Sequence, residues 1–194
     1  MTLANTITAI IDEYYPPASP AREVLLRHSE MVARKALQTA RKVSHLHPDL
    51  EFIEQAAMLH DIGIFYARAP EIGCFGEYPY VCHGYLGRIL VEGKGLSRHA
   101  LVCERHVGVG LTLEEIRKQD LPLPLRDMVP VSLEERIVCY ADKFFSKKPG
   151  KDQEEWPVEM VLKSLEKYGL QKVARFTEWL ALFGEMGWWR KVNI

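Results

Sequence analysis

A histidine and an aspartate, His60 and Asp61, stand side by side at the end of the apolar run AAMLHDIG. Burying two ionisable side chains at the edge of a hydrophobic core costs free energy unless a partner compensates their polarity. The apolar faces of two other expected helices carry His28 and Asp142 in the same way. One divalent cation would satisfy two imidazoles and two carboxylates together, whereas four isolated buried groups would each need a partner of their own. These four residues are therefore candidate metal ligands.

The adjacency of His60 and Asp61 restricts the geometry of such a site. Neighbouring residues of a helix project about 100° apart, so the two share one metal only if it lies between their directions, or if Asp61 bridges two metals. His83 in VCHGYLG and His106 in CERHVGVGL lie near glycines at the ends of expected helices, where an imidazole can reach a cleft. We predict that Asp61, His83 and His106 hold a second metal.

Other polar residues are expected to lie in solvent or in turns. His99 stands beside Arg98 near the start of its helix, and His45 and His47 belong to a helix end and turn. The basic cluster SKKPGK, residues 146–151, is typical of a solvated surface. None of these residues is predicted to bind metal.

The hydrophobic residues recur at three- and four-residue steps, the period of an α-helix, and period-two runs are nearly absent. We predict an all-α fold, a single-domain helical bundle over residues 1–194. Residues 64–80, IFYARAPEIGCFGEYPY, lack a sustained period and predict a long loop, interpreted as a lid over the site. The first expected helix covers residues 4–14, the second starts at the Ser19 cap, and the third runs from Asp49 to Gly63. Two more helices start near Val81 and after Ser97, and the capping boxes Thr112–Glu115 and Ser132–Glu135 each open another. A final pair of helices closes the chain.

The order H…HD…D, with the segments AAMLHDIG and RIVCYADKF, resembles the HD superfamily of metal-dependent phosphohydrolases. The matching positions are His28, His60, Asp61 and Asp142. The resemblance implies an HD-domain core over residues 20–148, with C-terminal helices over residues 149–194 outside it. Some members of the superfamily resemble the longer order H…HD…H…H…D and bind two metals, which supports the second site.

The resemblance implies that the metals polarise a phosphoryl oxygen and activate a bound water, so that a hydroxide attacks phosphorus. Asp61 is then both metal ligand and catalytic residue, since its carboxylate can orient that water. The implied cofactor is a divalent metal, two ions of iron or manganese, with magnesium, cobalt and nickel as alternatives. The cations nearest in sequence to the ligands, Arg88, Arg105 and Lys143, are candidate substrate-binding residues.

The substrate class follows from the same resemblance. The cyclic-dinucleotide branch carries a lysine where this chain has Ile64, and a second histidine where it has Arg105. These departures favour a small phosphorylated metabolite instead, a nucleotide or a dinucleoside polyphosphate. Two alternatives stay open: a metal-stabilised regulatory domain that binds a nucleotide without hydrolysing it, and an iron-dependent oxygenase.

The bulk composition agrees with a protein that acts on small molecules. The chain has 194 residues, 47% of them hydrophobic, and a formal net charge of −1, which gives no electrostatic signature of a nucleic acid polymer or a membrane as partner. It lacks a signal-peptide pattern and any apolar run of about 18 residues. The four cysteines form no C-x-x-C pair and are expected to be free thiols. We expect a cytoplasmic protein.

Overall fold

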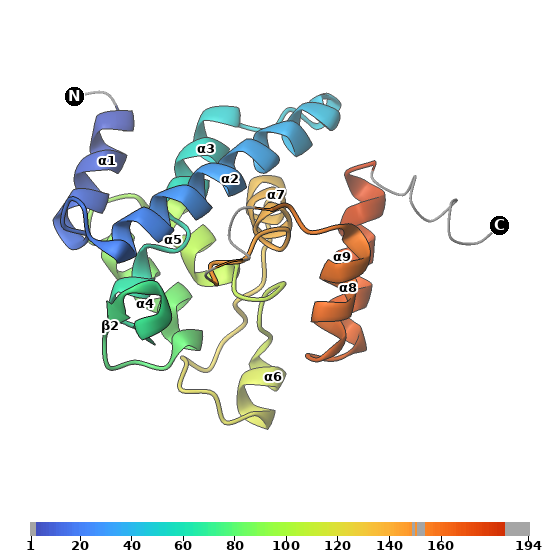
Figure 1. Ribbon diagram of the computed structural model, residues 1–194. Coiled ribbons are helices and arrows are strands. Elements are labelled where there is room, and N and C mark those ends of the chain that lie inside the picture. Colours follow the sequence, from blue (N-terminus) through green and yellow to red (C-terminus); the bar gives the residue numbers. More distant parts are fainter. Residues whose placement is uncertain (1–2, 149, 151–153, 185–194) are drawn as a thin grey trace.

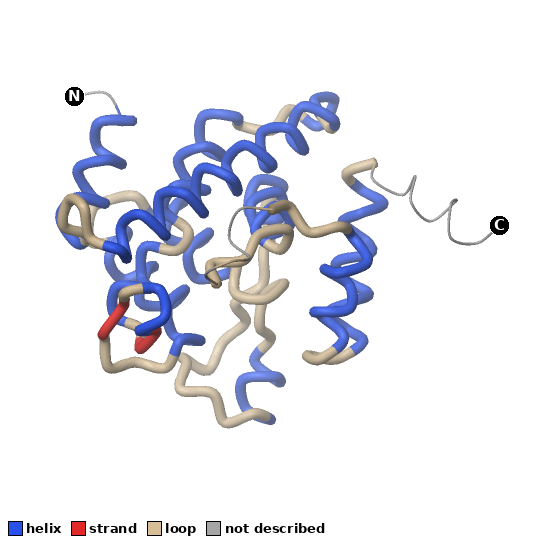
Figure 2. The backbone as a smooth tube through the Cα atoms, in the orientation of Figure 1, coloured by secondary structure: helices blue, strands red, loops and turns tan. Residues whose placement is uncertain are grey.

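The computed structural model describes residues 3–148, 150 and 154–184, and this part of the chain is almost entirely helical (Figures 1 and 2). The predicted all-α class is confirmed. The α-helices are α1 (Leu3–Tyr14), α2 (Pro20–Lys42), α3 (Leu50–Leu59), α4 (His83–Glu92), α5 (Ser97–Arg105), α6 (Leu113–Lys118), α7 (Leu133–Asp142), α8 (Val158–Glu166) and α9 (Leu170–Leu182). Short 3₁₀ helices cover Ser44–Leu46, Ile62–Tyr66, Pro70–Ile72 and Tyr80–Cys82, and β1 (Arg68–Ala69) pairs antiparallel with β2 (Cys74–Phe75).

The long helix α2 packs against both α3 and α7, and links two hydrophobic clusters (Figure 1). The first cluster contains Val32 of α2 together with residues of α3, α7, α8 and α9. The second contains Leu25 of α2 together with residues of α1, α4, α5 and the segment after α3. His28 lies between Val32 and Leu25 on the same buried face. The boundary between the two clusters therefore passes through the first candidate ligand.

Side-chain caps define several of the helix starts. Ser19 accepts a hydrogen bond from the backbone N–H of Arg22 at 3.3 Å, and Thr112 forms the predicted reciprocal capping box with Glu115. Ser132 also caps its helix, but the Glu135 carboxylate accepts from the backbone N–H of Val131 and pairs with Arg105 instead of closing the box. The second predicted capping box is thus only half formed, because Glu135 is used to bind a neighbouring helix.

The segment 64–80 is more ordered than the predicted loop. It contains two 3₁₀ turns and the β1–β2 pair, and the side chains of Ile64, Ala69, Ile72 and Cys74 are buried in the second cluster. The backbone N–H of Arg68 donates to the carbonyl of Tyr78 at 2.9 Å, which closes the segment on itself. Five buried apolar side chains and backbone pairing anchor this segment to the core, while nine of its seventeen residues remain exposed.

Gly63 was predicted to end a helix that carries His60, but α3 already ends at Leu59 and a 3₁₀ turn starts at Ile62. Gly63 has another role, close packing against α4. A Cβ at this position would overlap the carbonyl oxygen of His83 and the backbone nitrogen of Gly87. The glycine therefore lets the segment after His60 approach the helix that begins with His83.

The two closing helices pack as a hairpin on α7 (Figure 1). The ring of Phe176 in α9 stacks on Tyr140 of α7 with centroids 5.1 Å apart, and Phe183 meets the same tyrosine edge-on at 5.0 Å. The predicted pair of helices is confirmed within the described residues, while residues 185–194 of the predicted C-terminal segment lie outside them. This hairpin covers the helix that ends with Asp142.

The structure also bears on the state of the cysteines and on membrane-spanning helices. All four cysteines are free, and all four are buried. Among the helices of the described residues, none combines the length and the apolarity that crossing a membrane requires.

Replacement of Gly63 by alanine is expected to lower the free energy of unfolding by about 1–3 kcal/mol, because the new methyl group overlaps backbone atoms that cannot rotate away. The matched control is Gly93→Ala at the end of α4, where φ is −62° and a Cβ would meet its nearest atom at 3.4 Å. The control is expected to be neutral or stabilising by up to about 1 kcal/mol. Urea unfolding of both variants tests the close-packing role, and equal stabilities would contradict it.

Candidate metal centre

Four ligand-type side chains from three helical segments converge in the interior. One ligand atom from each of His28, His60, Asp61 and Asp142 lies within 4.8 Å of the others, and all four residues are buried. His28 Nε2 lies 2.9 Å from Asp142 Oδ1 and 3.3 Å from Asp61 Oδ2, and His60 Nε2 lies 3.2 Å from the same Asp61 oxygen. The residues predicted to share one metal are thus brought together.

A second group shares the Asp61 carboxylate. Its other oxygen, Oδ1, lies 3.3 Å from Nε2 of both His83 and His106, and the two Nε2 atoms are 3.0 Å apart. Each oxygen of Asp61 therefore faces a different set of imidazoles. This arrangement is compatible with a carboxylate that would bridge two cations, and it involves the six residues predicted from the sequence.

The end of α3 explains how His60 and Asp61 both reach the centre. The helix stops at Leu59, and Asp61 has left α-helical geometry, with φ −101° and ψ 5° before the next 3₁₀ turn. The angular separation of about 100° that a continuous helix would impose on adjacent side chains no longer applies. The change of helix type is what allows two successive side chains to point to one centre.

Backbone carbonyls fix the tautomers of three histidines. Nδ1 of His60 donates to the carbonyl of Ala57 at 2.7 Å, and in the same way His83 and His106 donate to the carbonyls three residues before them, at 2.6 and 2.7 Å. A carbonyl only accepts, so Nδ1 must carry the proton and Nε2 of the neutral ring presents a lone pair. Holding the second ring nitrogen in this way is typical of metal-binding histidines.

The facing lone pairs test whether the residues fit a cation. The three facing atoms of the second group are His83 Nε2, His106 Nε2 and Asp61 Oδ1. When the rings are neutral, all three atoms are hydrogen-bond acceptors, and none can donate a proton to another. In addition, His60 Nε2 is buried without a hydrogen-bond partner among the described residues, and Asp61 Oδ1 is buried facing only the two imidazole nitrogens. Buried acceptors that converge without donors are destabilising. The donor set of nitrogen and carboxylate oxygen fits divalent transition metals, so the residues fit the implied cofactor.

Burial and neighbouring charges place most ligands in the required protonation state. Burial, together with the Lys147 ammonium, lowers the pKa of His28 to about 4, and burial lowers that of His106 to about 4. Burial alone would raise the pKa of Asp61, but Lys147 and His60 hold it well below its usual value. Burial opposes the charge on His60, and the Asp61 carboxylate overcomes it and raises the His60 pKa to about 9. The Asp61 carboxylate thus stabilises the positive charge of the groups around it.

Lys147 also lies at this centre, although the sequence predicts it to lie on a solvated surface. Its Nζ lies 2.6 Å from Asp61 Oδ2 and 3.2 Å from His28 Nε2, and its side chain is only 14% exposed. The prediction that the whole SKKPGK cluster is solvated was wrong for this residue, because α7 ends at Asp142 and the following chain turns Lys147 back over the ligands. Lys143 also lies here, with Nζ 2.6 Å from Asp142 Oδ2.

A cavity of about 510 Å³ opens beside the ligands. Its lining, among the described residues, includes His83, His106 and Asp142 with Lys143 and Lys147. The other two candidate substrate-binding cations are not part of the lining. Arg88 pairs with the buried Glu104, and Arg105 pairs with Glu135 at 2.9 Å, so both guanidinium groups connect helices. The prediction that these two arginines bind substrate has no support in their positions.

His99 corrects another expectation, since it is buried and not exposed. Its Nε2 lies 3.1 Å from Gln55 Oε1 and its ring packs edge-on against Phe52, away from the ligand groups.

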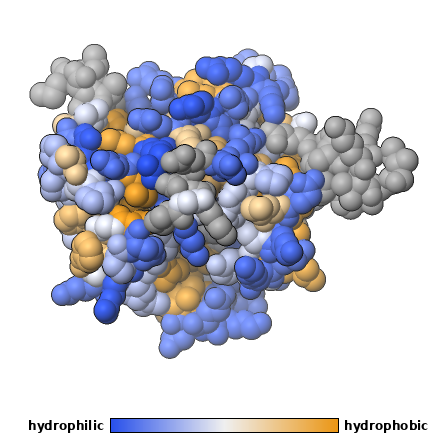
Figure 3. All heavy atoms as spheres, viewed as in Figure 1, coloured by the Kyte–Doolittle hydropathy of each residue, from blue (hydrophilic) through white to orange (hydrophobic). Residues whose placement is uncertain are grey.

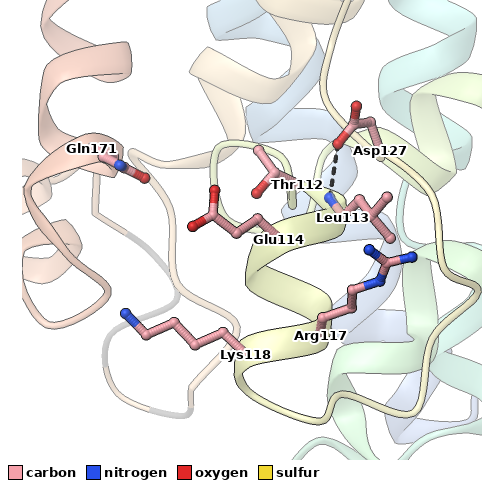
Figure 4. A pocket seen from close by; sticks show the side chains of 7 residues that line it. All are labelled: Thr112, Leu113, Glu114, Arg117, Lys118, Asp127 and Gln171. Carbon is pink, nitrogen blue, oxygen red and sulfur yellow. Dashed lines mark hydrogen bonds between the residues drawn. The ribbon is translucent and has the colours of Figure 1, made fainter.

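A larger hollow of about 630 Å³ lies over α6, where Glu114, Arg117, Lys118 and other side chains line its rim (Figure 4). None of the seven residues lining that hollow belongs to the ligand groups. The cavity beside the ligands is therefore the candidate site.

Comparison with known proteins gives a family match over the same region. The family model described as "HD domain" matches residues 25–146, which is more than half of the chain and contains the six candidate ligands. No solved structure matches the chain. The match stops before α8, so the closing hairpin lies outside it.

Curated relatives share parts of the chain. It is 32% identical over 123 residues to an uncharacterized protein of Methanocaldococcus jannaschii, a match covering 62% of this chain and 65% of the relative. Two proteins named tRNA (cytidine(56)-2'-O)-methyltransferase are also similar, from Picrophilus torridus (32% identity over 65% of this chain) and Thermoplasma volcanium (28% over 79%). The chain spans only 33% and 40% of the lengths of these two relatives.

Metal stoichiometry tests the two groups separately. The wild-type protein, reconstituted with manganese and dialysed, is expected to hold about two metals per chain by elemental analysis. His83→Ala and His106→Ala are expected to hold about one, because each removes one of three ligand atoms from the second group. The matched control is His99→Ala, a buried histidine outside both groups, which should keep the wild-type content. Wild-type content in both His83 and His106 variants would show that the second group binds no metal.

Metal removal is expected to destabilise the protein, since the cation compensates buried carboxylates. At free metal about one hundred times the dissociation constant, binding stabilises the folded state by about 2.7 kcal/mol, which corresponds to about 5–10 °C in Tm for a chain of this size. Scanning calorimetry with manganese and with chelator measures the difference. Asp61→Asn, which removes the shared charge, should show no such difference. A Tm that is the same with metal and with chelator in the wild type would contradict a metal centre.

Proposed function

Because the chain belongs to the HD-domain family, we propose that it is a metal-dependent phosphohydrolase acting on a small phosphorylated metabolite, a nucleotide or a dinucleoside polyphosphate. The observation that carries the proposal is the Asp61 carboxylate, with one oxygen directed at each imidazole group, beside a cavity of about 510 Å³. A volume of this size accommodates a small organic ligand of the size of a nucleotide.

Divalent cations bound by this donor set would supply Lewis-acid activation of a phosphoryl oxygen and of a water nucleophile. The chain's own residues do the positioning. Asp61 is completely buried, so its orientation is fixed, and an ionised carboxylate there can accept a hydrogen bond from an attacking water. His60, His83 and His106 are held by backbone carbonyls, which keeps their Nε2 atoms directed at the centre. Preorganised groups of this kind avoid reorganisation during the reaction.

Two lysines favour a phosphorylated substrate. Lys143 and Lys147 line the cavity, and their ammonium groups contact the carboxylates of Asp142 and Asp61 respectively. An ammonium group that is largely shielded from water binds a phosphate oxygen more strongly than one in bulk solvent. A phosphoryl group entering the cavity would meet both cations beside the ligand groups. A neutral substrate would gain less from these two charges than a phosphorylated one.

The methyltransferase names of two relatives do not extend to this chain. The chain spans 33% and 40% of the two methyltransferases, so the larger part of each has no counterpart in the match. The described residues carry a metal-type ligand set in the region matched to the HD domain. Hydrolysis by that centre is the activity that these residues support best.

Release of inorganic phosphate is the direct test. We expect the wild-type protein to release phosphate from at least one member of a panel of phosphorylated metabolites assayed with Mn, Fe, Co, Mg and Ni, and Asp61→Asn to be inactive. No phosphate release with any metal, together with a nucleotide-induced rise in Tm, would instead support the non-catalytic binding domain. Dioxygen uptake by the iron-loaded protein would support the oxygenase.

Lys147→Ala is expected to raise KM for the active substrate at least about tenfold, because a charge-assisted hydrogen bond to phosphate contributes about 1.5–3 kcal/mol. The metal content should not fall, since the replacement removes a competing cation from Asp61. Its exposed neighbour provides the control, Lys148→Ala, which should keep the wild-type KM. An unchanged KM in Lys147→Ala, or a loss of bound metal, would contradict the role in phosphate binding.

A further inference from the structure

We propose that the α8–α9 hairpin forms a ring-binding wall of the cavity, which selects substrates that carry a nucleobase beside the reacting phosphate. We define the ring-binding wall as Trp156, Leu165 and Tyr168, three residues of the cavity lining. All three follow residue 146, where the family match ends. The inference rests on the proposed function for the position of the phosphate, but it concerns residues that the metal chemistry does not use.

The cavity combines two chemically different surfaces. His83, His106 and Asp142, with the lysines beside them, provide charge and cation ligands. The ring-binding wall and Phe145 provide an apolar and largely aromatic surface in the same cavity. A substrate that uses both surfaces must join a phosphate to a flat apolar group. A sugar phosphate or inorganic pyrophosphate would leave the aromatic side chains in water.

Two aromatic side chains of the wall have surface on which a ligand can stack, although Trp156 also packs against the first hydrophobic cluster. Tyr168 lies in the turn between α8 and α9 and is 69% exposed, although it is a large hydrophobic residue. Trp156 is only partly buried. The ring–ring contacts found within the described residues involve neither of them. Exposed aromatic rings beside a binding cavity favour stacking with a flat partner, and every nucleobase offers a π-face for this purpose.

The hairpin is held firmly against the metal side of the cavity. Lys172 of α9 donates to the carbonyl of Gly110 at 2.5 Å and pairs with Glu115 at 2.6 Å. Arg175, one turn later, donates to the carbonyl of Val109 at 2.8 Å. The loop that accepts these bonds follows the ligand His106 directly, so the wall and the second ligand group are tied together. Lys172 is therefore used as an anchor and is not available to the substrate.

The start of the hairpin is tied to the other ligand group. The backbone N–H of Trp156 donates to the carbonyl of Phe144 at 2.8 Å, two residues after Asp142. This bond places the tryptophan beside the end of α7, where Lys147 turns back over the ligands. Trp156 thus contacts the segment that follows Asp142, and α9 contacts the loop that follows His106. A fixed wall loses little conformational freedom when a ring binds, which favours selectivity.

The test compares a nucleoside monophosphate with ribose 5-phosphate, which has the same sugar phosphate without the base. Binding of the non-hydrolysable phosphonate analogues of both is measured by calorimetry on the manganese-loaded full chain, and KM is measured for both substrates. We expect Tyr168→Ala and Trp156→Ala each to weaken binding of the nucleotide analogue about tenfold, because stacking on one aromatic residue is typically responsible for at least that much. Binding of the ribose phosphate analogue should change less than about twofold.

The matched control is Leu170→Ala, which removes an 80% exposed apolar side chain from the same hairpin but not from the cavity lining. It should bind both analogues like the wild type. Should Trp156→Ala unfold, Tyr168→Ala at its exposed position carries the test alone. A wild-type protein that binds the two analogues equally, or variants that weaken both equally, would overturn the inference and leave the hydrolase proposal standing. Selective loss of nucleotide binding in a protein that hydrolyses neither substrate would support the wall and overturn the hydrolase.

Discussion

The buried carboxylate of Asp61 is the group on which the rest of the centre depends. Its two oxygens face separate pairs of imidazoles, at 3.2–3.3 Å, and it has no exposed surface. An isolated carboxylate in this position would cost several kcal/mol. The Lys147 ammonium lies 2.6 Å from Asp61 Oδ2, and the same carboxylate raises the pKa of His60 to about 9. Every other ligand is arranged around that negative charge.

The position of the centre between the two hydrophobic clusters gives it both rigidity and access. His28 follows Leu25 of one cluster and precedes Val32 of the other, and α3 contributes residues to both clusters just before His60. Core packing on each side fixes the backbone of the ligands, so the side chains cannot relax away from one another. A polar centre inside a single cluster would be equally rigid but closed to substrate, whereas the boundary between clusters opens to a cavity lined by His83, His106 and Asp142.

Helical periodicity indicated three of the six candidate ligands but not the position of Lys147. His28, His60 and Asp142 lie on apolar faces at helical spacing, and this pattern indicates burial directly from the sequence. The position of Lys147 depends on how the chain turns after α7, and no periodic pattern describes such a turn. Nearness in sequence predicts Arg88 and Arg105 as substrate-binding residues, but each pairs with a buried carboxylate instead. The same limit applies to Gly63, whose need for close packing arises from α4, a helix that starts twenty residues later.

The division of the chain separates the candidate metal ligands from the side chains of the closing hairpin. The ligands and the segments that carry them lie within residues 25–146, where the HD-domain match is found. The hairpin outside that range is anchored by hydrogen bonds to the carbonyls of Phe144, Val109 and Gly110, by the Lys172–Glu115 ion pair and by core packing, including the ring contacts with Tyr140 and Phe144. Because these contacts hold the hairpin, the exposed side chain of Tyr168 is not needed to anchor it. That side chain can therefore differ without disturbing the anchors, whereas the candidate histidine ligands are constrained by their contacts with Asp61 and Asp142.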